Sequence, residues 1–417
     1  MRYILGALML VSCFFSFSQN IDVASQTIED LCSREFAGRG YLDSGDRFAA
    51  DYIAKKFSSF NLKKFTKNYQ HPVSLSVNTI PKSDVLIDGK ELIPGLDYLI
   101  SPSANSISGD YLIFYISPKI LNAPKLVSKV KKAIKRGYVP VVPVYDSKND
   151  ELEKKIQTLR LISKNKPIIF LKKQLIWSVS THQSNSTEIW MIDSSFNRFS
   201  KQIHMNVVSK FIPTYTTSNV IGYVEGTIIP DSFIILCGHY DHLGRMGEAV
   251  FYGANDNASG IAMLLDLASY FSRNPQKYSI AFVAFGAEEA GLLGSLAYVK
   301  QPQIPLNQTK FVFNMDLMGS GHEGATIVNG KIYTEYYEKL NQINTKMKYL
   351  PSLKARGKAA NSDHYFFSEA GVPSFFIYLM GDYKYYHVPD DNPTHLKLGH
   401  YYTQSYLLIS DFIMSLN

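Results

Sequence analysis

Residues 234–260 decide both the fold and the chemistry of this chain, and they read IILCGHYDHLGRMGEAVFYGANDNASG. An apolar run ends at Cys237 and is followed by the residues GHYD at 238–241. Asp256 comes seventeen residues after His239, in a turn that precedes a helical pattern. Histidine and aspartate at the end of a buried strand and in a tight turn are typical of a metal site. A complete site needs further ligands and a base from elsewhere in the chain.

The composition is that of a globular protein with one large domain or two ordinary ones. Of the 417 residues 46% are hydrophobic and 19% charged, so the chain can bury a sizeable core. The 43 basic and 36 acidic residues give a net charge of only +7. Lysines cluster around 125–136 and 154–173, which is typical of solvated helix faces and loops. We therefore expect no nucleic-acid partner.

Residues 1–18 are predicted to be a signal peptide. Arg2 precedes an apolar run at 4–15, and Ser16-Phe17-Ser18 offers small residues at the positions that a signal peptidase reads. The run is too short for a transmembrane helix, which needs about 20 apolar residues, and we expect no other membrane-crossing segment. We therefore expect export to the periplasm or the medium, with lipoprotein anchoring at Cys13 as a minor alternative. Cys32 and Cys237 are then expected to be buried free thiols.

The region up to residue 110 is expected to begin with helices and continue with strands. Helical spacing occurs on both sides of a break at 36–40, and strand signals run from 68 to 99 with Asp88-Gly89 as a hairpin turn. Residues 111–190 have short strands, a basic amphipathic helix and Lys-rich, poorly periodic sequence. They are predicted to form a small β-rich inserted module without catalytic residues.

From residue 191 onward the chain is predicted to form the main α/β unit. Expected strands are 219–224, 232–237, 278–285, 311–315 and 374–378, and expected helices are 258–272, 289–299, 333–347, 362–370 and 398–416. Continuous apolar strands between helices are typical of a mostly parallel sheet buried on both faces. The prediction is an α/β fold, a three-layer sandwich with a central mixed, mostly parallel sheet flanked by helices.

Acidic and imidazole side chains follow four of these strands. They are His239, Glu288 with Glu289, Asp316 and His387, and Asp256 joins them from a loop. Ligands of open α/β sheets bind outside the carboxyl ends of the strands, so we expect these side chains to converge. Nitrogen and oxygen donors of this kind suit Zn²⁺. If Asp256 bridges, two metal ions each have three protein ligands, and Glu288 remains free to act as a base.

Each residue has a simpler explanation when it is taken alone. Glu288 and Glu289 fit the first turn of a helix, where acidic side chains are favoured. Asp256 fits a helix N-cap, and Asp316 and His387 fit loop positions. The joint pattern at the strand ends favours the metal site over these separate explanations.

The motifs resemble those of peptidase family 28, the di-zinc exopeptidases that include secreted leucine aminopeptidases, aminopeptidase Y, glutamate carboxypeptidase and glutaminyl cyclase. The similarity covers most of the chain. The matching stretches, in chain order, are 31–40, 217–222, 238–244, 253–260, 287–291 (AEEAG), 314–316 (NMD), 362–364 (SDH) and His387. The resemblance implies that 19–110 and 191–417 form the peptidase domain, that 191–417 is its di-zinc catalytic core, and that 111–190 is a protease-associated insert.

The resemblance also implies roles for single residues. His239, Asp256 and Asp316 match the ligands of one zinc ion, and Asp256, Glu289 and His387 match those of the other. Glu288 matches the general base. Asp241 matches a carboxylate that orients His239, Asp391 is expected to do the same for His387, and the Asp256–Asn257 peptide bond is a candidate cis bond.

One position departs from the pattern of some secreted relatives. A tyrosine that polarises the scissile carbonyl stands there three residues before the SDH motif, whereas this chain has Ala359. Tyr365, Arg356 or a tyrosine of 383–386 could supply that donor instead. Asp363 resembles a family site residue, although a charge at a helix N-terminus explains it equally well.

The resulting expectation is an exported aminopeptidase with two zinc ions per chain and peptide substrates. A carboxypeptidase or a glutaminyl cyclase of the same fold is the nearest alternative, and a cyclase needs only one zinc. A non-catalytic binding ectodomain is disfavoured because no ligand of the set is missing. The sequence leaves the side-chain preference and the oligomeric state open.

Overall fold

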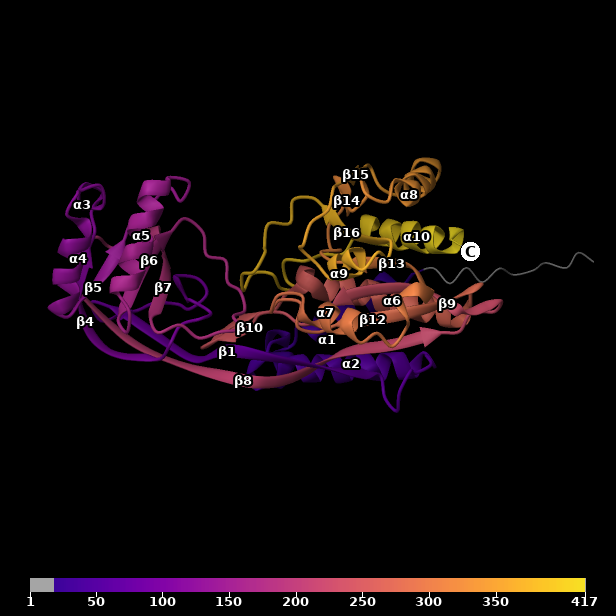
Figure 1. The fold of residues 1–417 in the computed structure, drawn as a ribbon, viewed down its shortest axis with the longest axis horizontal. Coiled ribbons are helices and arrows are strands. Elements are labelled where there is room, and N and C mark those ends of the chain that lie inside the picture. Colours follow the sequence, from indigo (N-terminus) through magenta and orange to yellow (C-terminus); the bar gives the residue numbers. More distant parts are fainter. Residues whose placement is uncertain (1–18, 417) are drawn as a thin grey trace, which may run out of the picture.

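The computed structural model of the chain describes residues 19–416 (Figure 1). The expected signal peptide and Cys13 lie outside these residues. Helix α1 (Ile21–Leu31) and helix α2 (Gly45–Ser59) are separated by two 3-10 turns at Arg34–Arg39 and Leu42–Ser44. The expected break between two helical segments is therefore confirmed.

A sheet of parallel strands forms the centre of the larger lobe. Its strands in spatial order are β16 (Ser374–Met380), β13 (Thr309–Met315), β9 (Ile229–His239) and β12 (Tyr278–Phe285). All neighbours within this group are parallel, so their carboxyl ends lie along one edge. Antiparallel strands flank the group, with β14 (Gly324–Val328) beside β16 and β8 (Gln202–Val224) beside β12.

Alternate side chains of these strands enter two different hydrophobic cores. In β9, Ile234 and Leu236 lie in one core, whereas Ile235 and Cys237 lie in the other. Because successive side chains of a strand point to opposite faces, a continuous apolar run requires cover on both faces. This is the three-layer arrangement expected from the sequence, and the mixed sheet does not close on itself.

Helices supply that cover on both faces. Helices α1 and α2 pack with α6 (Ser259–Arg273), which also contacts α10 (His400–Ser415), on one face. Helices α7 (Leu293–Lys300) and α9 (His364–Glu369) pack together on the other. Helix α8 (Thr334–Met347) lies against α10 and against the edge strand β15 (Leu353–Ala355), which pairs with β14.

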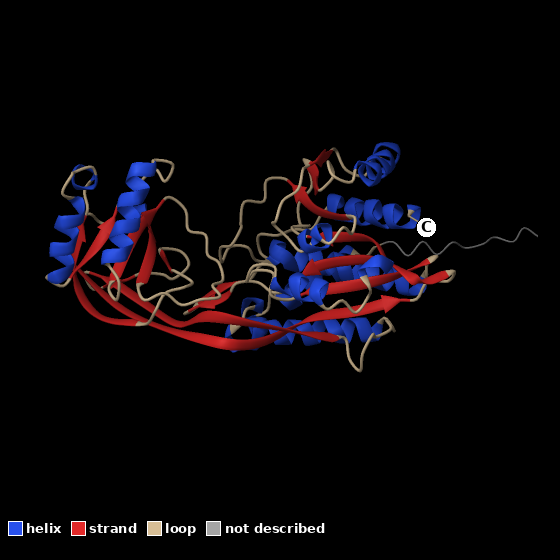
Figure 2. Cartoon of the chain, viewed as in Figure 1, coloured by secondary structure: helices blue, strands red, loops and turns tan. Residues whose placement is uncertain are grey.

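Two long antiparallel strands connect this lobe to a second, smaller one. Strand β1 (Gln70–Ile87) pairs with β8 over nearly its whole length, and both run from one lobe into the other (Figure 2). The smaller lobe contains β3 (Tyr98–Ile100), β4 (Ile107–Tyr115), β5 (Tyr138–Val142), β6 (Pro167–Lys172), β7 (Thr187–Ile192), α3 (Pro118–Leu121), α4 (Leu126–Lys135) and α5 (Asp150–Ile162). Strands β4, β5, β6 and β7 are parallel neighbours.

The elements differ from the expectations at a few places. Helix α5 occupies the stretch that we expected to be poorly periodic, so residues 111–190 alternate helices with strands rather than being mainly β. Strands β14 and β15 were not predicted. Helix α7 begins at Leu293 instead of Glu289, because Ala287, Gly291 and Leu292 have positive φ angles that no helix accommodates.

The remaining short elements lie in the loops. They are β2 (Lys90–Glu91), β10 (Gly244–Met246), β11 (Ala249–Phe251), a π-type turn at Ala254–Ala258, and 3-10 turns at Asp193–Ser195 and Leu306–Gln308. Asp88 and Gly89 form the expected hairpin turn between β1 and β2. Cys32 and Cys237 are buried free thiols, as expected. Among residues 19–416, no helix is long and apolar enough to cross a membrane.

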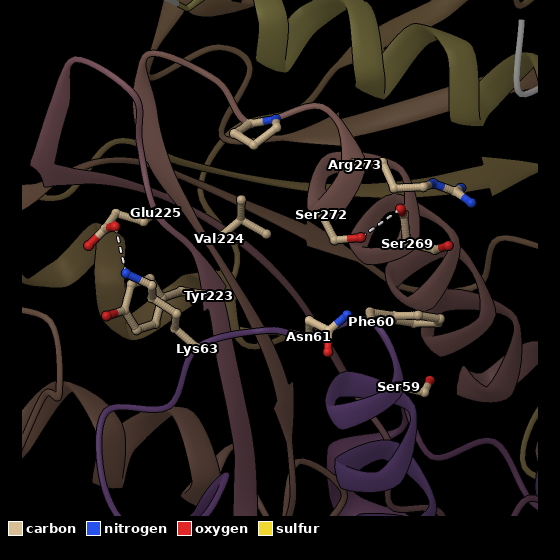
Figure 3. Close-up of a pocket in the computed structure, with 11 residues that line it drawn as sticks. Ser59, Phe60, Asn61, Lys63, Tyr223, Val224, Glu225, Ser269, Ser272 and Arg273 are labelled. Carbon is tan, nitrogen blue, oxygen red and sulfur yellow. Dashed lines mark hydrogen bonds and ion pairs between the residues drawn. The ribbon is translucent and has the colours of Figure 1, made fainter. Parts of the chain in front are cut away.

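A surface hollow of about 440 Å³ lies near the amino end of β12, where Val224 of β8 pairs with Ile280 (Figure 3). In it Lys63 Nζ is 2.5 Å from Glu225 Oε2, and Ser272 Oγ donates to the carbonyl of Ser269 at 2.9 Å. No group of three potential metal ligands lies there among the residues that the structure places. The candidate site is at the opposite ends of the parallel strands.

Candidate metal centre

Six side chains converge at the carboxyl ends of the parallel strands, and we call them the six-residue cluster. The cluster consists of His239, Asp256, Glu288, Glu289, Asp316 and His387, all of which line one cavity of about 220 Å³. His239 ends β9, Glu288 and Glu289 follow β12, Asp316 follows β13, and His387 follows β16. The convergence expected from the strand-end pattern is therefore present.

Asp256 lies between the two histidines. Its Oδ1 is 3.3 Å from His239 Nε2, and its Oδ2 is 3.1 Å from His387 Nε2. His239 Nε2 is also 3.4 Å from Asp316 Oδ1, and His387 Nε2 is 3.4 Å from Glu289 Oε2. One carboxylate thus faces two imidazoles through different oxygens, and each imidazole has a second carboxylate beside it.

Both histidines present Nε2 to these carboxylates because Nδ1 is held by a backbone carbonyl. His239 Nδ1 is 3.0 Å from the carbonyl oxygen of Asp241, and His387 Nδ1 is 2.9 Å from that of Trp177. A carbonyl oxygen only accepts, so Nδ1 carries the proton in each ring and Nε2 is available to a metal ion.

These contacts correct two expectations about orienting carboxylates. Asp241 does contact His239, but through its backbone carbonyl and not through its carboxylate. The Asp241 carboxylate instead accepts hydrogen bonds from the backbone N–H groups of Glu288 (3.0 Å) and Glu289 (3.3 Å) and from the Tyr41 hydroxyl (3.0 Å). It therefore holds the turn that carries Glu288 and Glu289.

Asp391 does not contact the His387 ring, which is held by Trp177. The Asp391 carboxylate accepts from the backbone N–H groups of Asn255 (2.8 Å) and Asp256 (3.1 Å) and from the Tyr383 hydroxyl (2.7 Å). It therefore fixes the loop of Asp256. The loop 382–399, which carries His387 and Asp391, has little regular structure. The sequence therefore did not show which group each of these two side chains would contact.

The loop that carries Asp256 is also held by a fully buried arginine, Arg39. Arg39 donates to the carbonyls of Gly253 (2.7 Å) and Asp256 (3.3 Å). Gly253 has φ of 60°, and a Cβ there would lie 2.1 Å from the carbonyl oxygen of Asp256 and 2.5 Å from the His242 ring. Only glycine fits this position. The Asp256–Asn257 bond is cis, as expected from the family resemblance.

A third histidine, which the sequence analysis did not single out, lies beside the cluster. His242 is fully buried, and its Nδ1 is 2.7 Å from Glu289 Oε1. Its ring meets that of His387 edge-on, with centroids 5.6 Å apart. The signal was present in the motif GHYDHLG, but only the fold shows that this side chain reaches Glu289, 47 residues later.

Burial and the mutual proximity of these groups shift their pKa values strongly. Burial alone lowers the pKa of His387, but Glu289 and Asp256 outweigh it and raise the pKa to about 11. Burial raises the pKa of Glu289, but the charge of His387 and hydrogen bonds with His242 and His387 together outweigh it and lower the pKa to about 2. The pKa of Glu288 is raised well above its ordinary value, first by burial and then by neighbouring carboxylates, although His239 opposes this rise.

The cavity has a polar floor, and both apolar and polar side chains form its wall and rim. Besides the cluster it is lined by Leu317, Arg356, Asn361, Phe376, Tyr378 and Tyr386. The Tyr386 ring stacks on His387 with centroids 3.9 Å apart. Burial, followed by the carboxylates Asp256, Glu289, Asp316 and Glu288, raises the pKa of the Tyr386 hydroxyl, which therefore stays protonated beside them.

Besides Asp241 and Asp391, two further expected site residues do not line the cavity. Tyr365 lies in α9, where its ring packs against Phe366 and Lys358. Asp363 is buried at the N-cap of α9, and burial raises its pKa to about 7, although His239 opposes this. Ser362, between Asp363 and the cavity residue Asn361, donates to Asp316 Oδ2 at 3.1 Å.

The donor set fits divalent metal ions. The ligand atoms of His239, Asp256 and Asp316 lie within 4.8 Å of one another, and so do those of His242, Asp256 and Glu289. In the second group His387 could take the place of His242, because His387 lines the cavity whereas His242 Nδ1 is bonded to Glu289. The buried Asp316 Oδ1 accepts no hydrogen bond from the described part of the chain. Nitrogen and carboxylate donors with this spacing suit zinc.

Comparison with known proteins finds the same family that the motifs suggested. Residues 219–408 match the family model described as Peptidase family M28. Aminopeptidase YwaD of Bacillus subtilis is 31% identical over 201 residues, which are 45% of this chain and 42% of that protein. A vacuolar membrane protease of Candida glabrata is 26% identical over 227 residues, which are 52% of this chain and 23% of that protein. The chain thus spans less than half the length of these curated relatives.

Solved structures resemble the chain over both lobes. BSAP, a zinc aminopeptidase from Bacillus subtilis, has a TM-score of 0.72 at 18% identity and covers 95% of each chain. A Peptidase M28 precursor from Shewanella amazonensis has a TM-score of 0.64 at 16% identity over 95% of this chain and 96% of that one. At these identities the likeness shows the fold. Residues 219–408, which carry both histidines and all four carboxylates of the six-residue cluster, therefore resemble peptidase family M28.

Proposed function

We propose that this chain is an exported, zinc-dependent exopeptidase, specifically an aminopeptidase that removes N-terminal residues from peptides. The observation that carries the proposal is the Asp256 carboxylate, whose two oxygens face two histidines that each have a second carboxylate beside them. The match to the family M28 model and the similarity to an aminopeptidase of Bacillus subtilis support it. A cavity of about 220 Å³ suits the end of a peptide, since sites for larger ligands hold about 300–1,000 Å³.

We assign two zinc ions per chain. His239, Asp256 and Asp316 would hold one ion, and Asp256, Glu289 and His387 would hold the other. When bound, the zinc pair supplies Lewis-acid polarisation of the scissile carbonyl and of the attacking water. The two histidines would lose their Nε2 protons when metal binds, because the same lone pairs become ligands.

The chain's own residues supply the base and a hydrogen-bond donor. Glu288 lines the cavity beside the ligands and belongs to neither proposed ligand set, so it would accept the proton of the attacking water and pass it to the leaving amine. The Tyr386 hydroxyl lies beside the same carboxylates and stays protonated, so it donates to the oxygen of the scissile carbonyl as negative charge develops there. Asp241 fixes the turn that carries Glu288.

The assignment extends to the parts of the chain outside the cluster. Residues 1–18 are assigned as a signal peptide, residues 19–110 and 191–417 as the peptidase domain, and residues 111–190 as its insert. Peptides are the expected partners, and the mild charge gives no reason to expect nucleic acid.

The test compares Glu288→Gln with wild type in the zinc-loaded protein. We expect two zinc ions per chain and an unchanged circular-dichroism spectrum in both, with hydrolysis of an aminoacyl-nitroanilide reduced by about 10²–10⁴ in the variant. Glu248→Gln, an exposed position, is the matched control and should keep full activity. Near-normal turnover by Glu288→Gln would refute the proposed base, and one zinc per chain would favour a glutaminyl cyclase instead.

A further inference from the structure

The rim of the cavity carries a cation that the proposed chemistry does not use. Arg356 and Asn361 are exposed and line the cavity, whereas the floor consists of the buried His239, Asp256 and Asp316. Arg356 is the one arginine or lysine among the described lining residues. A substrate bound with its reacting bond at the floor would extend toward this rim.

The backbone holds Arg356 in place while its side chain remains available. The Arg356 N–H donates to the carbonyl of Ile327 at 2.9 Å, and the Arg356 carbonyl accepts from the N–H of Lys331 at 3.1 Å. Within residues 19–416 the guanidinium makes neither an ion pair nor a hydrogen bond. The neighbouring Lys358, by contrast, is paired with Glu369.

Arg356 is also not a counter-ion of the cluster. Among residues 19–416, no carboxylate of the cluster lies within ion-pair distance of its guanidinium, and Asp256, Glu289 and Asp316 pair with histidines instead. The cation is therefore not neutralised by the cluster.

From this geometry, and on the basis of the proposed function, we propose that Arg356 binds a carboxylate of the substrate at the rim of the cavity. A guanidinium recognises a carboxylate through two parallel N–H···O bonds, and Asn361 can add a donor. The carboxylate has two possible sources: the side chain of an acidic N-terminal residue, or the terminal carboxylate of a dipeptide. In either case the enzyme prefers an anionic substrate over its neutral counterpart.

Two pairs of substrates distinguish these sources. The first pair is glutamyl-p-nitroanilide and glutaminyl-p-nitroanilide, which differ in the charge of the side chain. The second pair is the dipeptide Leu-Gly and its amide Leu-Gly-NH₂, which differ in the terminal charge. We expect the zinc-loaded wild type to prefer the anionic member of at least one pair.

Arg356→Gln should remove that preference. We expect kcat/KM for the preferred anionic member to fall roughly ten- to a hundredfold, while that of the neutral member changes less than about threefold. Lys358→Gln is the matched control, because it removes a neighbouring positive charge that does not line the cavity, and it should leave the preference intact. Wild type without a preference for either anion, or an equal loss for both members of a pair in Arg356→Gln, would overturn the proposal.

A binding measurement separates failure of this inference from failure of the proposed function. If none of the four substrates is hydrolysed by correctly folded, zinc-loaded protein, the aminopeptidase assignment fails. Calorimetric titrations with L-glutamate, L-glutamine and the uncut dipeptide pair then still test Arg356. Tighter binding of an anion than of its neutral counterpart, lost in Arg356→Gln, supports the carboxylate site, and equal binding refutes it.

Discussion

At the scale of single residues, the cluster depends on groups that fix which atom of each ligand faces the cavity. The Nδ1 atoms of His239 and His387 are hydrogen-bonded to backbone carbonyls, and the Ser362 hydroxyl donates to Asp316 Oδ2. His242 does the same for Glu289, because its Nδ1–H donates to Oε1 and leaves Oε2 facing His387. Such contacts set the orientation and basicity of a metal ligand, and their loss typically weakens metal binding about 10–100-fold.

This argument gives a prediction for His242. Replacing it with Phe keeps a ring in the buried space but removes the donor to Glu289, so zinc affinity should fall roughly 10–100-fold. His242→Gln retains an N–H donor and should lose less. Zinc affinity is measured by competition with a chelator of known affinity, at a temperature at which all variants are folded.

A histidine with a similar contact on the surface provides the control for His242. His204 Nδ1 is 2.9 Å from Asp110 Oδ1, but both side chains are exposed and neither lines the cavity. His204→Phe should leave zinc affinity unchanged. If His242→Phe binds zinc as tightly as wild type, the contact with Glu289 does not position a ligand.

The strand-end residues of the site could be predicted from the sequence, whereas their supporting contacts could not. His239 and Asp316 lie directly at the ends of apolar strands, so local patterning places them. The contact between His387 and Trp177 joins residues 210 apart and is made by a backbone carbonyl, which any residue type possesses. Sequence patterns report side-chain type, and they carry no signal for a contact of that kind.

At the scale of elements, the same distinction explains which helices and strands were found. Helix α6 and strands β9 and β12 have apolar residues at a clear helical or strand period. Helix α5 buries only Ile156 and Leu159 completely, so its charged sequence shows little period. The edge strand β15 has three residues, none buried, and is defined mainly by pairing with β14. Elements with little apolar surface are fixed by tertiary contacts that a single sequence does not display.

Helix α6 also contains an acidic residue whose burial opposes folding at neutral pH. Asp266 lies where α6 packs against α10, and its Oδ2 accepts a hydrogen bond from Gln19 Nε2 at 3.1 Å. Burial raises the pKa of Asp266 to about 7, although Gln19 opposes this. The unfolded side chain ionises near pH 4, so the folded protein retains a proton that the unfolded protein loses. The cost of ionising Asp266 therefore grows as pH rises from about 4 to 7.

Asp266→Asn should remove this cost. The variant should be more stable than wild type, with a gain on the order of 1–3 kcal/mol at about pH 8 and a smaller gain at about pH 5.5. Urea unfolding of the zinc-saturated protein at the two pH values measures the difference. Asp51→Asn is the control, because Asp51 also accepts from a glutamine, Gln70, but is exposed. A gain that is equal at both pH values would show that the charge of Asp266 is not its cause.

At the scale of the whole molecule, the smaller lobe takes part in the site. A loop that follows β6 in the segment 111–190 brings Trp177 against His387, where the Trp177 backbone N–H donates to the carbonyl of His387 at 3.1 Å and the Trp177 carbonyl accepts from His387 Nδ1 at 2.9 Å. The buried Trp177 ring stacks on Phe251 with centroids 4.8 Å apart, and its Nε1–H donates to the carbonyl of Ile100 at 2.8 Å. The position of one ligand therefore depends on the packing of the insert.

Changes at Trp177 should consequently loosen one zinc ion more than the other. Trp177→Ala removes the ring that anchors the loop and should destabilise the protein by about 3–5 kcal/mol, while Trp177→Phe keeps the stacking on Phe251 and removes only the bond to Ile100. Both variants should lose the ion held by His387 sooner during dialysis against a chelator, so that about one zinc per chain remains where wild type retains two.

The other tryptophan of the chain makes the test specific. Trp190 lies in β7 of the smaller lobe and is partly buried. The imidazole of His387 is oriented by Trp177 and not by Trp190. Trp190→Phe should lower stability without changing zinc retention. If Trp190→Phe and Trp177→Phe release zinc equally, or if Trp177→Phe retains both ions as wild type does, the insert supports the fold only. Selective loss of one ion would instead show that the smaller lobe holds a proposed ligand of the metal centre in place.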